Sequence, residues 1–167
     1  GLAARRVAVT APFHTPAMEK PSRALGDFIE KIETRLPRIP VYSNVTAAPY
    51  PEDLEAIREQ LAVHLARPVR FVEQIRAMHR DGARVFLEVG PGRVLGSLVQ
   101  LQQGGIASRV IPSLRHALDE VDDGEALLAA CGRLWNCGVG IDGERAGLWT
   151  RGQRIPLPLY PFQRKRF

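Results

Sequence analysis

The chain has 167 residues, of which 45% are hydrophobic and 25% are charged, and its formal net charge is +5. This length and composition are typical of a globular domain, and no apolar run approaches the roughly 20 residues that a membrane-spanning helix needs. The two cysteines have neither a redox-pair nor a zinc spacing, so we expect a cytoplasmic protein. The basic residues are spread along the chain without a recognisable aromatic-and-basic module, which argues against nucleic-acid binding.

The chain begins with an apolar run, residues 7–10, and reaches a histidine between two prolines, Pro12 and Pro16. Proline fixes its own φ and pushes the preceding residue toward extended geometry. His14 should therefore lie on a stiff loop at the end of a strand, which is a suitable place for a general base. A half-buried structural histidine fits the same pattern, so this motif alone leaves both interpretations open.

Hydrophobic periodicity predicts an alternating α/β order for the segments that follow. In chain order these are a helix over 18–35, a strand over 39–45, a helix over 52–65, a helix from 69 to about 80, a strand over 85–89, a helix from 94 and a strand over 110–112. The near-continuous apolar run 85–89 is typical of a parallel strand that is covered on both faces.

The composition changes after residue 103. Residues 126–135 predict one amphipathic helix, whereas 138–158 are rich in glycine and proline and contain few residues that could form a core. A segment of this kind cannot bury itself alone. We therefore expect two parts, a domain piece over 1–103 and an extended linker over 104–167 that lies against a neighbouring domain.

Five ordered motifs carry a resemblance to a known family. They are PFHTP at 12–16, VYSNVT at 41–46, HLARPVRF at 64–71, DGARVFLEVGPGRVL at 81–95 and LPLYPFQRKRF at 157–167. Together they resemble the malonyl-type acyltransferase domain of polyketide synthases and related fatty acid synthases. The resemblance implies that 1–103 form the C-terminal half of an α/β-hydrolase-like acyltransferase domain with a parallel sheet, and that 104–167 form the linker that follows it.

The same resemblance implies roles for four residues. His14 would be the catalytic base, and the backbone carbonyl of His64 would orient it. Phe13 would fill the space that a branched substrate needs, and Asn44 would lie at the edge of the substrate pocket. The nucleophile of this family is the serine of a Gly-His-Ser-x-Gly motif. Residues 1–167 do not contain this motif, so we expect the nucleophile in a preceding segment.

The implied function is the transfer of malonyl, or a related extender group, from CoA to that serine and then to the phosphopantetheine of an acyl carrier protein in polyketide biosynthesis. Neither a metal nor a tightly bound cofactor is expected. The implied partners are the N-terminal half of the same acyltransferase, a ketosynthase domain and an acyl carrier protein. Two alternatives stay open: a non-catalytic scaffold or docking segment of a synthase, and a malonyl transacylase of the fatty-acid type.

Overall fold

The computed structural model describes residues 9–102, 109–147, 155–163 and 165. Residues 7 and 8 of the predicted first strand lie outside the described residues. The chain divides into two compact units, one formed by Gly1–Phe86 and Val94–Val110, the other by Leu87–Arg93 and Ile111–Phe167.

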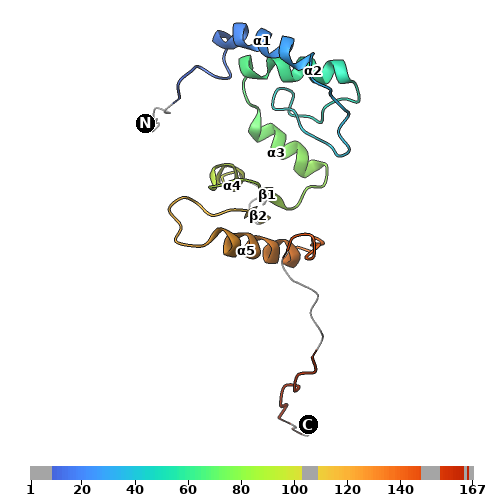
Figure 1. Ribbon diagram of the computed structural model, residues 1–167, viewed down its shortest axis with the longest axis vertical. Coiled ribbons are helices and arrows are strands. Elements are labelled where there is room, and N and C mark those ends of the chain that lie inside the picture. The colour runs from blue at the N-terminus through green and yellow to red at the C-terminus, as the bar shows by residue number, and fades with distance from the viewer. Residues whose placement is uncertain (1–8, 103–108, 148–154, 164, 166–167) are drawn as a thin grey trace. The chain divides into compact units, whose positions relative to one another are not determined.

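The first unit contains most of the helices. In chain order they are η1 (Pro16–Met18), α1 (Glu19–Ile29), α2 (Leu54–Val63), η2 (His64–Ala66), α3 (Phe71–Arg80) and α4 (Val94–Gln100). Helices α1 and α2 lie side by side (Figure 1). Gly26 permits this close approach, because a Cβ at that position would lie 3.3 Å from the Cβ of Ala62. The Ser22 hydroxyl donates a hydrogen bond to the Ala62 carbonyl, which ties the two helices at the same level.

The core of the first unit lies between α3 and α4. Ile75 and Val99 are only 5% and 3% exposed. The partly buried side chains that pack against them are Phe71, Met78, Phe86 and Val110. A loop is fixed to the same helix, because the Gln74 side-chain amide donates to the Tyr42 carbonyl at 2.9 Å. Helix α3 therefore joins the hydrophobic core to the segment that precedes α2.

The strands β1 (Phe86–Glu88) and β2 (Val110–Pro112) form a two-stranded parallel sheet. Both strands lie where periodicity predicts them. Leu87, at the centre of β1, is 43% exposed, so the described residues of this chain do not cover both faces of the strand. After β1 the chain turns through Gly90 and Gly92, whose φ angles of 144° and 95° favour glycine.

The second unit is organised around α5 (Asp123–Asn136). Asp122 caps this helix, because its carboxylate accepts a hydrogen bond from the Gly124 amide at 2.8 Å. The predicted helix over 126–135 is thus confirmed and is slightly longer than expected. Residues 155–163 form neither helix nor strand and are exposed, as the prediction of an extended segment requires. The predicted tail residues 164, 166 and 167 lie outside the described residues.

Two predicted elements differ from the structure. The first helix ends at Ile29 rather than at 35, because the amides of Lys31 and Ile32 donate to carbonyls three residues back and tighten the last turn. The predicted strand over 39–45 is wrong. Only one bridge forms there, between Tyr42 and Pro49, because the chain folds back through a turn in which the Ala47 amide donates to the Ser43 carbonyl at 2.8 Å.

Candidate functional site

His14 lies on a short loop before η1. Its backbone has a φ of 63°, a left-handed conformation that is uncommon for a residue other than glycine. The Thr15 hydroxyl closes the loop by donating to the Pro12 carbonyl at 2.7 Å. The His14 amide donates to the Leu65 carbonyl at 2.8 Å. A strained backbone is held in place by these bonds, and such strain is often found at functional sites.

The side chain of His14 is fixed by η2. Its Nδ1 lies 3.1 Å from the carbonyl oxygen of His64, so an N–H at this atom donates to the carbonyl. The two imidazole rings are tilted against each other, with their centroids 5.1 Å apart. The arrangement selects the tautomer of His14 whose Nε2 is free of a proton and can accept one. The structure thus brings together the two histidines that the resemblance pairs, although they lie fifty residues apart in sequence.

Asn44 contacts this site through the His64 side chain. Its amide Nδ2 lies 3.2 Å from His64 Nε2, and its backbone carbonyl accepts a hydrogen bond from the Arg70 amide at 3.0 Å. Burial lowers the pKa of the His64 imidazole, and the positive charge of His14 lowers it further. His64 therefore remains neutral at a pH where an ordinary histidine is partly protonated.

Phe13 is the least enclosed of the predicted site residues. It directly precedes His14, and its side chain is 45% exposed. Its amide donates to the Ala11 carbonyl at 2.9 Å, which keeps the tight turn before the histidine. The ring is therefore accessible next to the candidate base, and its role in substrate choice stays a prediction.

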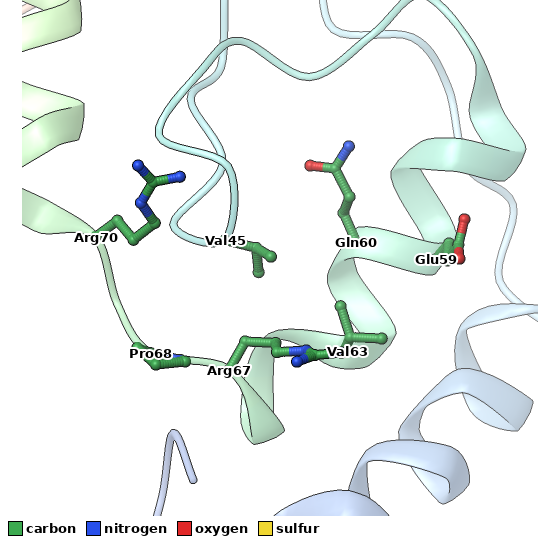
Figure 2. A pocket seen from close by; sticks show the side chains of 7 residues that line it. All are labelled: Val45, Glu59, Gln60, Val63, Arg67, Pro68 and Arg70. Atoms are coloured by element: carbon green, nitrogen blue, oxygen red, sulfur yellow. The ribbon is translucent and has the colours of Figure 1, made fainter. Parts of the chain in front are cut away.

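A pocket of about 540 Å³ lies in the first unit, and two of its lining residues, Val45 and Val63, directly follow Asn44 and precede His64 in sequence (Figure 2). Its lining residues come from the loop after Asn44, from α2 and from the segment between η2 and α3: Val45, Glu59, Gln60, Val63, Arg67, Pro68 and Arg70. Figure 2 shows residues 67–70 along one side of it and α2 along another. The side-chain oxygen of Gln60 is buried and has no hydrogen-bond partner among the described residues.

Sequence reasoning did not single out these polar lining residues. Arg67 and Arg70 belong to the HLARPVRF motif, yet nothing in their spacing indicates a shared pocket. Arg70 already has partners, because its guanidinium donates to the Thr46 carbonyl at 3.2 Å and to the Glu73 carboxylate at 3.3 Å. The bond to Thr46, together with the bond from the Arg70 amide to the Asn44 carbonyl, anchors the start of α3 to the loop over 44–46.

Two other kinds of feature do not occur in the part of the chain that the structure describes. No group of three or more His, Cys, Asp or Glu side chains is placed there to hold a metal ion. None of the helices there has both the length and the apolar character to cross a membrane.

Comparison with known proteins identifies the family, although no protein-family model matches the chain. The chain is 33% identical over 172 residues to a phenolphthiocerol/phthiocerol polyketide synthase of Mycobacterium tuberculosis, a match that covers 99% of this chain and 11% of that protein. It is 34% identical over 166 residues to the spectinabilin polyketide synthase system protein NorB of Streptomyces orinoci, covering 97% of this chain and 8% of that protein. The chain thus spans about a tenth of the length of these relatives.

Solved structures give the same result. The acyltransferase domain of ZmaA aligns with a TM-score of 0.75 and 26% identity, covering 87% of this chain and 34% of that one. The malonyl CoA-acyl carrier protein transacylase (FabD) of Coxiella burnetii aligns with a TM-score of 0.65 and 32% identity, covering 79% and 38%. The family resemblance of the five motifs is therefore confirmed, and the chain is a part of an acyltransferase domain of the kind found in polyketide synthases and malonyl transacylases.

Proposed function

We propose that this chain supplies the base side of an acyltransferase that moves malonyl, or a related extender group, from CoA to a serine and then to an acyl carrier protein. The observation that carries the proposal is the hydrogen-bond distance of 3.1 Å between His14 Nδ1 and the His64 carbonyl. This contact leaves His14 Nε2 as a proton acceptor without any need for a buried carboxylate.

The chemistry follows from that arrangement. His14 Nε2 takes the proton of the serine hydroxyl while the serine oxygen attacks the malonyl thioester carbonyl. The protonated imidazole then gives that proton to the CoA sulfur as the carbon–sulfur bond breaks, which releases CoA-SH and leaves malonyl as an ester. The second half repeats these steps with the phosphopantetheine thiol of the carrier as the attacking group, and the serine regains its proton.

The nucleophile must come from a different segment, since residues 1–167 contain no Gly-His-Ser-x-Gly sequence. We assign residues 1–103 to the C-terminal half of the acyltransferase domain and 104–167 to the linker after it. The solved acyltransferases support the partial coverage of the domain, because this chain covers only 34% and 38% of their length. The N-terminal half of the same domain is thus the first partner of this chain.

An acyl carrier protein is the second proposed partner. A solved complex of a type II polyketide synthase acyl-carrier protein with its malonyl-transacylase contains a chain that aligns with this one at a TM-score of 0.60 and 31% identity. The phosphopantetheine arm belongs to the carrier, so malonyl-CoA is a substrate and no tightly bound cofactor or metal takes part. A cytoplasmic location is part of the same proposal, because the CoA ester and the carrier are found there.

The exposed tail favours a second role as a docking segment. Leu159, Tyr160 and Phe162 are 89%, 75% and 76% exposed, and the two aromatic rings meet edge to face with centroids 5.3 Å apart. Aromatic side chains are enriched at protein interfaces. We propose that this segment contacts the ketosynthase of the synthase. In the alternative of a purely non-catalytic scaffold, docking would be the only function of the chain.

Malonyl loading distinguishes these functions. The full-length acyltransferase that contains this chain should gain the mass of one malonyl group after incubation with malonyl-CoA, and should pass it to a holo acyl carrier protein. Mass spectrometry of the intact enzyme and of the carrier measures both steps. A carrier without its phosphopantetheine arm is the control. A purely scaffolding segment would leave both masses unchanged.

Phe13→Ser should relax the choice of extender unit. The smaller side chain opens space beside His14, and one methyl group in an apolar pocket is worth only about 1–3 kcal/mol. We therefore expect the preference for malonyl-CoA over methylmalonyl-CoA to fall by about tenfold in a direct competition. Phe28→Ser, on an exposed face of α1, is the matched control. An unchanged product ratio would assign the selectivity to other residues.

A further inference from the structure

Asn44 contacts the site through the His64 side chain. The Asn44 amide nitrogen lies 3.2 Å from His64 Nε2. A side-chain NH₂ group can only donate, so Nε2 must be the acceptor and carries no proton. The imidazole then holds its single proton on Nδ1. The contact therefore selects one neutral tautomer of His64.

The backbone of Asn44 is itself firmly held. Its carbonyl accepts a hydrogen bond from the Arg70 amide at 3.0 Å. The neighbouring Ser43 is fully buried, and its hydroxyl oxygen accepts a hydrogen bond from the Val45 amide at 3.2 Å. The first bond ties Asn44 to the start of α3, and the second fixes the loop around it. The Asn44 amide thus approaches His64 from a fixed position.

The charge on His64 matters because its ring centroid lies 5.1 Å from that of His14. His14 becomes positive whenever it accepts a proton, and a second positive imidazole at this distance would oppose that step. The other charged residues that line the two pockets beside Val63 are Glu19, Arg23, Glu59, Arg67 and Arg70. Glu19 and Arg23 pair with each other, and Arg70 pairs with Glu73. His14 is the charged neighbour that lowers the pKa of His64, in addition to burial.

We propose that Asn44 is a positioning residue that keeps the His64 imidazole neutral and fixed, so that His64 orients His14 through its carbonyl without placing a second positive charge beside it. His64 then has two functions in one residue: its backbone oxygen accepts from the base, and its side chain receives the Asn44 amide. The kinetic consequence rests on the proposed function, whereas the state of the His64 ring does not.

The protonation state of the His64 ring can be measured directly by ¹⁵N NMR of the full-length acyltransferase with ¹⁵N-labelled histidine. We expect His64 Nε2 to give the signal of an unprotonated acceptor nitrogen and to titrate below the ordinary histidine pKa. Asn44→Ala should raise that titration midpoint, because the donor that favours the neutral ring is gone. Thr46→Ala, two residues away and exposed, is the matched control. A protonated Nε2 in the unsubstituted enzyme, or a midpoint that Asn44→Ala leaves unchanged, would overturn the proposal.

Kinetics test the consequence for His14. Asn44→Ala should slow malonyl loading by about tenfold near pH 6.5, and by less near pH 8, where His64 is neutral without help. His64→Ala keeps the backbone carbonyl but removes the ring. When Asn44→Ala is added to His64→Ala, the rate of malonyl loading should not fall further, because the ring through which Asn44 affects His14 is already absent.

A direct role of Asn44 in substrate binding gives a different result. The KM for malonyl-CoA would then rise, the loss would be the same at both pH values, and it would persist in the His64→Ala background. That outcome would overturn the proposal. If the unsubstituted enzyme loads no malonyl at all, the proposed function fails, and the NMR titration still decides the role of Asn44.

Discussion

Replacing His14 with alanine should lower the rate of malonyl loading in the full-length acyltransferase by at least about 100-fold, the usual loss when a general base is removed. The structure supports this expectation because His14 Nδ1 is engaged by the His64 carbonyl at 3.1 Å, which leaves Nε2 as the proton acceptor. Alanine keeps a Cβ on the left-handed backbone at φ 63°, so the substitution does not relieve backbone strain as glycine would.

A second variant separates chemistry from structure. His14→Gln retains a side-chain N–H that can donate to the His64 carbonyl, yet it cannot take a proton at neutral pH. It should therefore be as slow as the alanine variant. His116→Ala, at an exposed histidine in the other unit, is the control and should load malonyl normally. Rapid loading by His14→Gln would mean that the ring serves only to hold the loop.

The spacing of apolar residues predicts the helices and strands of this chain whose position depends on contacts close in sequence. Helix α3 and strand β2 lie where periodicity places them, since their apolar spacing reflects the faces that they bury. The segment 39–45 shows the limit of this reasoning. Its apolar residues favour a strand, but a strand needs a neighbour along its length, and the turn through Ala47 supplies only one bridge. The apolar pattern of residues 39–45 does not show which hydrogen bonds the chain makes once it has turned at Ala47.

In the candidate site, too, the local features can be predicted from the sequence and the long-range contacts cannot. Proline chemistry predicts a stiff loop around His14, and the loop is held by short-range bonds. The contact from His14 to His64 spans fifty residues, so only the family resemblance could pair them. No pattern linked Asn44 to His64, because a hydrogen bond between a loop and a helix end depends on how both are packed. Long-range polar contacts of this kind require the structure.

Ile75→Ala should produce the largest loss of stability in the first unit. Ile75 lies at the centre of the α3–α4 core, is 5% exposed and packs with Val99. Removing three carbon atoms from such a position costs about 2–5 kcal/mol, because apolar contacts are lost and a cavity remains. A loss near 3 kcal/mol corresponds to a roughly 100-fold decrease in hydrogen-exchange protection of the amides in α3 and α4.

Hydrogen exchange is the suitable measurement because it reports on α3 separately from the second unit. The Asp81 amide, which donates to the Ala77 carbonyl at 2.9 Å, is a reporter at the end of that helix. Val72→Ala is the matched control, since Val72 lies on the same helix and is 43% exposed. It should reduce protection by less than about fivefold, because an exposed side chain loses few contacts. Equal losses in the two variants would mean that α3 unfolds independently of its packing on α4. In that case the core around Ile75 would not hold the Arg70 end of α3 against Asn44, and the site would depend on the loop bonds alone.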